Sequence, residues 1–334
     1  MKRCTHFIWE SFEEGNLSEL QNISVLSLIH KKNERTDLKN YRAISLTNVN
    51  YHILAFALSM RLQKVIWKII SAQQTGYINK RFIGTNIRAI LDICENIEAN
   101  NDAGILLLLD FEKAFDSVER SFLFSTLQKL NFGKQFIQWI KTLYSEPKAI
   151  IKNNGYLSSK INITCGIRQG CPVSALLFIL IIEILSHKIS IDTSIHGVVA
   201  KVGQKHHEFK SFQYADDISI FLHSDSDLQK VLKLVSKFTE VAGPKLNMSK
   251  TECIWLGQHK EKQQNCNVAG IKWPTEPVRC IGIYIGHDKR ECDNLNWDKK
   301  FENMKKQLAL WQNRGKVMVI KSLLIPQLLF PAHF

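Results

Sequence analysis

Five consecutive aliphatic residues at positions 105–109 are followed directly by an aspartate, Asp110. A run of this length without a polar residue is typical of a strand that other elements cover on both faces. The run therefore predicts a central strand in a layered domain. A carboxylate at its end is costly unless a cation, hydrogen-bond donors or water compensate its charge. Asp110 is thus either a ligand of a cation or a carboxylate at the N-terminus of the next helix.

The remaining elements are predicted from the hydrophobic period, which is two in strands and 3.6 in helices. Strands are expected at residues 23–29 and on both sides of residues 215–217, and helices at 54–69, 118–130, 136–144, 173–185, 228–238 and 297–311. Asn154-Gly155 is typical of a hairpin turn. Helix 173–185 is apolar almost all round, which predicts a buried helix. The order of these elements indicates an α+β fold.

The chain of 334 residues carries 44 Lys+Arg and 31 Asp+Glu, a net charge of +13. Such an excess favours a polyanionic partner without identifying it. The N-terminus does not resemble a signal peptide, and the apolar runs are shorter than a membrane helix requires. We therefore expect an intracellular protein without a membrane span. Its eight cysteines contain no zinc-finger or Cys-x-x-Cys spacing, which predicts reduced structural thiols.

Two basic stripes are visible. Arg61, Lys64 and Lys68 share one side of the first predicted helix and are interpreted as a solvated face, with phosphate contact as the alternative. The helix at 297–311 carries lysines at positions 299, 300, 305 and 306. Its aromatic and aliphatic residues at helical spacing, from Trp297 and Phe301 onward, are predicted to be core rather than a base-stacking platform.

A second acidic pair, Asp216-Asp217, lies at the predicted hairpin tip, where a turn ordinarily prefers Asn-Gly or Asp-Gly. One of the two carboxylates can meet Asp110 at a shared cation while the other supports it. Carboxylates without a nearby His or Cys select hard cations such as Mg²⁺. Two such ions are typical of both polymerases and nucleases, and the spacing alone does not separate these classes.

Four motifs in order separate them. The segments are NYRAISL at 40–46, DFEKAFD at 110–116, RQGCP at 168–172 and FQYADD at 212–217. The last three resemble motifs A, B and C of reverse transcriptases. Together the four resemble the second-reading-frame polymerase of LINE-type non-LTR retrotransposons, from about residue 20 to the C-terminus. A two-metal nuclease does not explain the basic residues near position 40 or the 168–172 motif.

The resemblance implies a right-hand polymerase fold. It divides the chain into an N-terminal extension (1–19), fingers (20–100), a palm with an antiparallel sheet (101–285) and a partial helical thumb (286–334). The implied activity is RNA-directed DNA synthesis with two Mg²⁺ ions, or Mn²⁺ in their place. The implied partners are an RNA template, a DNA primer and dNTPs, with no membrane. The family is expected in cytoplasm and nucleus.

The resemblance also implies the metal site. Asp110 and Asp216 match metal ligands, and Asp217 ligates or supports them. The backbone carbonyl of Phe111 matches a ligand of the second ion. Lys250 matches a lysine that protonates the leaving pyrophosphate, although a solvated surface lysine is an equal alternative.

The nucleotide-binding residues are carried over in the same way. Phe115 matches the bulky residue that closes against a ribose 2′-hydroxyl, while a core phenylalanine is the compatible alternative. Gln169 and Gly170 match the loop against the incoming nucleotide, with Arg168 as a further contact. Lys31 and Arg42 match the finger cations that hold the triphosphate. The 280–283 segment resembles the hairpin that grips the primer.

Several positions depart from the family pattern. Ala43 and Ala175 replace prolines, and residues 30–33 lack the usual Pro and Gly, which predicts a looser finger loop. No endonuclease segment precedes the motifs and no cysteine-rich segment follows them, so we expect the chain alone not to nick target DNA. The alternative to an active enzyme is a truncated, inactive retrotransposon remnant that keeps only nucleic-acid binding.

Overall fold

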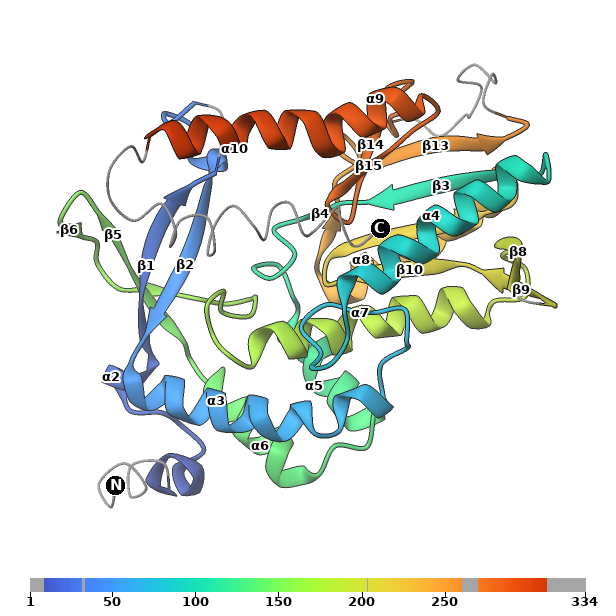
Figure 1. Cartoon of the computed structure of the whole chain (residues 1–334). Coiled ribbons are helices and arrows are strands. Elements are labelled where there is room, and N and C mark those ends of the chain that lie inside the picture. Colours follow the sequence, from blue (N-terminus) through green and yellow to red (C-terminus); the bar gives the residue numbers. More distant parts are fainter. Residues whose placement is uncertain (1–8, 32–33, 203, 260–269, 311–334) are drawn as a thin grey trace.

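The computed structural model describes residues 9–31, 34–202, 204–259 and 270–310 (Figure 1). Its helices are α2 (Glu19–Asn22), α3 (Val49–Gln63), α4 (Ile83–Ala99), α5 (Arg120–Lys129), α6 (Lys134–Leu143), α7 (Ser174–Ile191), α8 (Asp225–Ala242), α9 (Lys289–Asp293) and α10 (Lys299–Leu310). Short 3₁₀ or π turns are η1 (Leu38–Asn40), η2 (Ile66–Lys68) and η3 (Asn294–Asp298).

The strands occur singly and in runs between these helices. They are β1 (Ile23–His30), β2 (Tyr41–Thr47), β3 (Ala103–Leu109), β4 (Phe111–Glu112), β5 (Lys148–Asn153), β6 (Tyr156–Leu157), β7 (Ile161–Asn162), β8 (Val198–Val202), β9 (Lys205–Phe209), β10 (Ser211–Tyr214), β11 (Asp217–Leu222), β12 (Lys245–Leu246), β13 (Glu252–Gly257), β14 (Val278–Cys280) and β15 (Ile283–Ile285).

The central sheet has the order β10-β11-β3-β13 and is antiparallel throughout. The aliphatic run predicted to be a covered strand is β3, which lies between β11 and β13. Ile105, Leu106 and Leu107 are fully buried. The prediction of a central strand is therefore confirmed, and Asp110 follows directly from its end.

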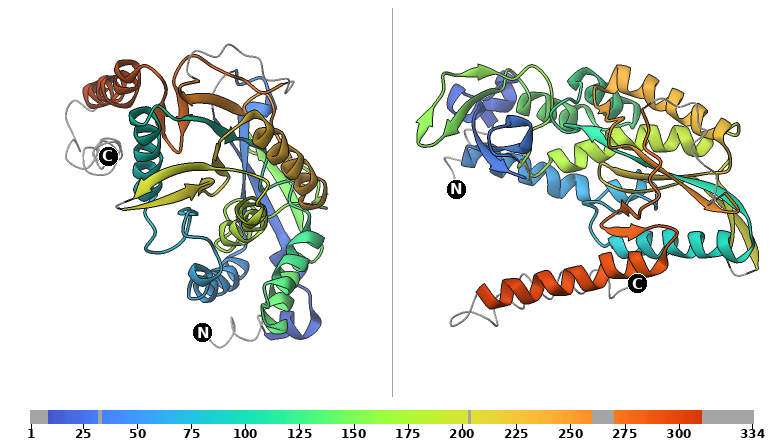
Figure 2. Two further views of the ribbon diagram at one scale, coloured as in Figure 1. Left: turned by 90° about the vertical axis from the view of Figure 1, so that its right-hand side faces the viewer. Right: turned by 90° about the horizontal axis from the view of Figure 1, so that it is seen from above.

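Helices cover both faces of the central sheet, because successive side chains of β3 point to opposite sides. Leu107 and Leu109 belong to the same buried cluster as residues of α7 and α8. Leu106 belongs to a second cluster with Ile87 and Ile90 of α4. Figure 2 shows α4 and α8 on opposite sides of the strands. This layering explains why β3 has no polar residue.

Helix α7 is the predicted helix without a polar face, and it extends to Ile191, beyond the expected end. It is long and apolar enough to cross a membrane by composition, but 67% of it is buried inside the protein. It packs against α3, α5 and α8. The protein core thus accounts for its composition.

A second sheet, called here the lateral sheet, has the order β2-β1-β5-β6, with β7 also paired to β5. β1 and β5 are parallel, so a strand near residue 25 pairs with one near residue 150. α4, from the segment assigned to the fingers, packs on β13, β8 and β10. Segments assigned to the fingers thus contact segments assigned to the palm in both the lateral and the central sheet. The division of the chain into lobes at residue 100 stays a prediction.

One helix expected to continue to residue 69 ends earlier. α3 stops at Gln63, and the chain enters a turn followed by η2. At the helix end, the Gln63 side chain accepts from the Asn79 N–H at 3.2 Å. Beyond it, the Arg81 guanidinium donates to the carbonyls of Trp67, Ile70 and Gln74 and holds the segment around η2. The stripe Arg61, Lys64 and Lys68 is exposed, as expected for a solvated face.

The prediction of a buried aromatic stripe near the C-terminus is wrong for the described residues. Trp297 and Phe301 are 38% and 45% exposed. In Figure 1, α10 extends away from the strands of the central sheet, so its apolar side has little to pack against. The Lys305 ammonium lies 4.6 Å from the centre of the Phe301 ring. Trp311 and the Leu308 side chain lie outside the described part.

The layered core predicts a large cost for truncating β3. Leu107→Ala is expected to lower the free energy of unfolding by about 3 kcal/mol, because it leaves a cavity between sheet and helices. Leu20→Ala is the matched control, since Leu20 is 79% exposed, and is expected to change it by less than about 0.5 kcal/mol. Urea denaturation measures both. Equal effects would contradict the assigned core.

Candidate active site

Three carboxylates lie around the end of the central sheet, close enough for their charges to interact. Leu109 of β3 pairs with Ile218 of β11, which brings Asp110 beside the β10–β11 turn that carries Asp216 and Asp217. Desolvation raises the pKa of Asp110, and Asp216 adds to the increase. The pKa of Asp217 is raised to about 6, first by desolvation and then by the charges of Asp216 and Asp110. The carboxylates thus repel one another across the turn, as ligands of a shared cation do when no cation is bound.

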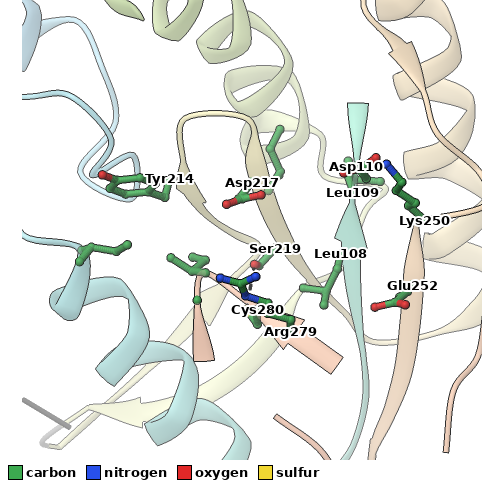
Figure 3. Close-up of a pocket in the computed structure, with 14 residues that line it drawn as sticks. Leu108, Leu109, Asp110, Tyr214, Asp217, Ser219, Lys250, Glu252, Arg279 and Cys280 are labelled. Atoms are coloured by element: carbon green, nitrogen blue, oxygen red, sulfur yellow. Dashed lines mark hydrogen bonds between the residues drawn. The ribbon is translucent and has the colours of Figure 1, made fainter. Parts of the chain in front are cut away.

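Two basic side chains flank this acidic group. The ammonium of Lys250 partly offsets the increase in the pKa of Asp110, as does a hydrogen bond from the Asn247 side chain. Arg279 acts in the same direction on the pKa of Asp217. In Figure 3, Lys250 reaches toward Asp110, and Arg279 comes from the opposite side, next to Cys280. Lys250 therefore belongs to the site, whichever role it has.

The donor set fits a hard divalent cation, because it consists of oxygen atoms only. In the described residues no three His, Cys, Asp or Glu side chains are grouped closely enough to hold a metal ion. A backbone oxygen is available, however. The Asn247 N–H donates to the Asp110 carbonyl at 2.8 Å. Hydrogen-bonded and non-hydrogen-bonded pairs alternate along an antiparallel ladder, so the next pair of β4 and β12, Phe111 and Leu246, is non-hydrogen-bonded. The Phe111 carbonyl is therefore outside that ladder.

The β1–β2 hairpin brings the two predicted finger cations toward these carboxylates. Lys31 follows β1 and donates its N–H to the Asn40 carbonyl at 2.8 Å, while Arg42 lies in β2. Desolvation, then Arg42 and Lys250, lower the pKa of Lys31. Asp110 acts on it in the opposite direction. A cationic group thus gathers above the acidic one, which suits a polyphosphate.

The 168–172 loop connects the lateral sheet to the segment after Asp110. The Ser45 N–H of β2 donates to the Gln169 carbonyl at 2.9 Å. Gly170 has φ +97°, and a Cβ there would lie 3.1 Å from the Ser45 carbonyl oxygen. The Gln169 side chain donates to both carboxylate oxygens of Asp116 at 3.2 Å. Gln169 is therefore held in place at the site.

Phe115 is a packed residue that stays partly exposed. Its ring stacks on Phe178 of α7, with centroids 4.5 Å apart. Its carbonyl accepts from the Ile167 N–H at 2.8 Å. Phe178 is fully buried, whereas Phe115 is only partly buried. The two interpretations of Phe115 are thus compatible in the structure.

Arg168 does not lie at the site, contrary to the expectation. It is 7% exposed, and its guanidinium donates to the Asn22 carbonyl at 2.6 Å. The same group stacks on the Tyr51 ring at 4.5 Å. The position of Arg168 next to Gln169 predicts a nucleotide contact, but its side chain points to α2 and α3 instead. Arg168 joins α2, α3 and the 168–172 loop.

A cavity of about 400 Å³ opens beside the carboxylates, between the central sheet and the β14–β15 hairpin. Asp110, Asp217, Lys250 and Arg279 line it. The segment that resembles a primer-gripping hairpin therefore forms one wall. Cys280 fixes this wall through its Sγ, which lies 3.2 Å from the Ser219 Oγ of β11.

Three site residues were missed by sequence reasoning. Asp116 closes the DFEKAFD motif, and its partner Gln169 comes from 53 residues later. Arg279 directly precedes the 280–283 segment. Tyr77 has φ +56° and its ring lies 6.2 Å from that of Tyr214. Asp116 and Arg279 adjoin recognised motifs, which was a usable signal, whereas nothing in the sequence marked Tyr77.

Comparison with known proteins gives a consistent result. Residues 29–285 match the family described as reverse transcriptase (RNA-dependent DNA polymerase). An uncharacterised 149 kDa protein of transposon TX1 from Xenopus laevis is 28% identical over 330 residues, 96% of this chain and 24% of that protein. The Pol polyprotein of retrotransposable element R2DM from Drosophila melanogaster is 25% identical over 255 residues, 76% of this chain and 23% of that protein. The chain spans about a quarter of the length of these relatives.

Two solved structures share the arrangement of elements. Telomerase from Candida albicans, solved with a fragment of telomeric RNA, aligns with a TM-score of 0.53 at 12% identity, over 98% of this chain and 56% of that chain. Telomerase from Candida tropicalis, also with telomeric RNA, aligns with a TM-score of 0.52 at 12% identity, over 92% of this chain and 52% of that chain. At such identity the likeness concerns the fold alone.

The crowded carboxylates predict a pH-dependent effect of removing one charge. Because the pKa of Asp217 is raised to about 6, the folded protein binds this proton more tightly than the unfolded chain does. The resulting stabilisation is complete below the ordinary pKa and is lost as the pH rises through 6. In EDTA, Asp217→Asn is therefore expected to raise the Tm at about pH 7 and to leave it unchanged below about pH 4.

Thermal unfolding across this pH range measures the difference. Asp102→Asn, at an exposed position before the other end of β3, controls for the substitution itself. A difference in Tm between Asp217→Asn and the native protein that stays constant with pH would contradict the prediction.

Proposed function

The chain belongs to the reverse transcriptase family, and on that premise we propose that it is an RNA-directed DNA polymerase that extends a primer 3′-hydroxyl with dNTPs. The predicted α+β right-hand polymerase fold is confirmed, and the relatives from transposon TX1 and element R2DM agree with the LINE-type resemblance. One observation carries the proposal. Asp110 and Asp216 lie close enough at the end of the central sheet for their charges to interact, and Lys31, beside Arg42, interacts with Asp110 from the lateral sheet.

The reaction joins the primer 3′-oxygen to the α-phosphorus of a dNTP and breaks the bond between that phosphorus and the leaving pyrophosphate. Asp110, Asp216 and the Phe111 carbonyl are the proposed ligands of two Mg²⁺ ions, with Asp217 ligating or supporting. When bound, these ions supply charge neutralisation at the attacking and leaving oxygens. Mn²⁺ suits the same oxygen ligands.

The other side chains bind and orient the nucleotide. Lys31 and Arg42 are proposed to hold the triphosphate, one as a point charge and the other as a bidentate fork. The Gln169–Gly170 backbone lies against the incoming nucleotide, where the absence of a side chain at Gly170 permits close approach. Lys250, beside Asp110, is proposed to give a proton to the pyrophosphate as it leaves.

The net charge of +13 supports a template–primer partner. The exposed Arg61, Lys64 and Lys68 stripe, together with the lysines of α10, is proposed as part of its path. The family description, an RNA-dependent DNA polymerase, supports an RNA template here. The proposed lobes are fingers at 20–100, a palm at 101–285 and a partial thumb at 286–334. A polymerase of this class is proposed to act in the cytoplasm and nucleus.

A primer-extension assay tests the activity, with an RNA template, a DNA primer, Mg²⁺ and dNTPs. The native chain is expected to extend the primer, and Asp216→Asn to lower the rate by at least about 100-fold through loss of a metal ligand. Asp102→Asn is the matched control and is expected to be as active as the native chain. If folded native protein binds template–primer but extends nothing, the alternative of an inactive remnant holds.

The proposed role of Phe115 predicts a preference for deoxyribonucleotides over ribonucleotides. Phe115→Ala is expected to increase incorporation of ribonucleotides relative to dNTPs by about tenfold or more, because the smaller side chain admits a 2′-hydroxyl. Competition between dNTP and rNTP in the same assay measures the ratio. Phe178→Leu controls for lost stacking, since Phe178 is buried behind Phe115. An equal change in both variants would assign the effect to packing and remove the gating role.

A further inference from the structure

A short segment between η2 and α4 is bound tightly to the hairpin that carries Asp216. Gln74 and Gln213 form an isolated parallel bridge next to β10. The Gln213 N–H donates to the Gln73 carbonyl, and the Thr75 N–H donates to the Gln213 carbonyl, both at 3.0 Å. The segment thus extends the central sheet beyond β10, and none of the four motifs includes it.

The Gln74 side chain makes the closest contact with the hairpin. Its Oε1 accepts from the backbone N–H of Gly76 and of Ala215, both at 2.9 Å. Its Nε2 donates to the Gln213 Oε1 at 3.2 Å and toward the Ala215 carbonyl at 3.4 Å. A glutamine amide has two acceptor sites and two donors, so Gln74 uses its full capacity. It is 0% exposed, and water cannot replace these partners.

The orientation of this amide is determined by its partners. Both groups facing Oε1 are backbone N–H groups, which can only donate, so rotating the amide by 180° would set donor against donor. Ala215 is held at both its N–H and its carbonyl by one side chain. Its φ is +57°, a left-handed conformation that is unfavourable for a residue with a Cβ. The Gln74 amide therefore maintains a strained backbone directly before Asp216.

Other elements hold the far side of the same network. Asn86 of α4 donates to the Gln213 carbonyl at 2.9 Å and to the Thr75 Oγ1 at 3.2 Å. The Gln213 Nε2 donates to the Ser186 Oγ of α7. These side chains are all at most 5% exposed. The hairpin is thus connected to helices on both faces of the central sheet through neutral amides and hydroxyls.

Space as well as hydrogen bonding sets the position of the hairpin. A Cβ at Gly76 would lie 2.5 Å from the Ala215 nitrogen and 3.2 Å from its Cα. The backbone at Gly76 therefore approaches the turn as closely as only glycine permits. A shift of either segment would break the contacts of Gln74 or create this clash.

We propose that Gln74 is a positioning residue for the catalytic carboxylate Asp216. It acts through Ala215, whose backbone it holds in the left-handed conformation that places Asp216 at the end of β3. The catalytic consequence rests on the proposed polymerase function, whereas the structural effect on the hairpin does not. A purely core-filling glutamine would instead affect stability without changing the reaction of the folded molecules.

Hydrogen exchange tests the structural effect without substrates or metal. Gln74→Met keeps the side-chain volume and removes all four hydrogen bonds. The amides of Gly76 and Ala215 are then expected to exchange at least about tenfold faster, while amides in the middle of β11 stay as in the native protein. Gln73→Met is the matched control, because the Gln73 side chain is exposed and only its carbonyl takes part. Unchanged exchange at both amides would overturn the proposal.

A second variant covers the case in which Gln74→Met does not fold. Gln74→Glu has the same shape, and burial favours its protonated form, which keeps an acceptor in place of Oε1 and one donor in place of Nε2. It can therefore still accept from both N–H groups. The amides of Gly76 and Ala215 are expected to stay protected in this variant. Fast exchange at both amides in folded Gln74→Glu would overturn the proposal.

Kinetics test the consequence for Asp216. In Gln74→Met, kcat per titrated active site is expected to fall by about tenfold or more, with the KM for dNTP within about twofold and a higher Mg²⁺ requirement. A lower Tm with unchanged kcat per active site would show a core role only and contradict the proposal. If the native chain extends no primer, the polymerase proposal fails, and the exchange experiment still decides whether Gln74 holds the hairpin.

Discussion

The burial of β3 between two helical layers is the constraint on which the rest of the structure depends. Its aliphatic residues require α7 and α8 on one face and α4 on the other, so the strand cannot move without exposing both clusters. Asp110 is the first polar residue beyond it. A carboxylate on so rigid a base is desolvated in a defined place, and its raised pKa follows directly. The chemistry of the site begins with this core.

Segments far apart in the chain assemble around that carboxylate because sheets and loops cross the lobes. β5 pairs with β1, and the 168–172 loop accepts a hydrogen bond from β2. The cationic hairpin of β1 and β2 is thereby held over the acidic turn of β10 and β11. The Gln74 amide then fixes that turn from the side of α4. Neutral hydrogen bonds thus position the cationic and acidic groups, and these bonds leave the charged side chains available to a charged ligand.

Most of the elements could be predicted from the sequence, because burial on one face or on both faces sets the spacing of apolar residues along the chain. β3, α7, α8 and the hairpin at Asn154 follow from such patterns. β2 was not identified as a strand, since its residues are only partly buried and their alternation is weak. Helix ends were less predictable, because α3 ends where the Gln63 side chain accepts from the N–H of Asn79, 16 residues further along the chain. The exposed aromatic residues Trp297 of η3 and Phe301 of α10 show that a helical pattern predicts an apolar face without predicting what packs against it.

The sequence by itself determined the central strand, the acidic residues at its end and at the hairpin tip, and the family, because these depend on local order along the chain. Only the tertiary structure decided which side chains share the site. It directed Arg168 to α2 and α3, brought Asp116 to Gln169 and Arg279 to Asp217, and enclosed Gln74 against Ala215. The direction of a side chain depends on contacts with residues that are distant in sequence, and no local pattern records them.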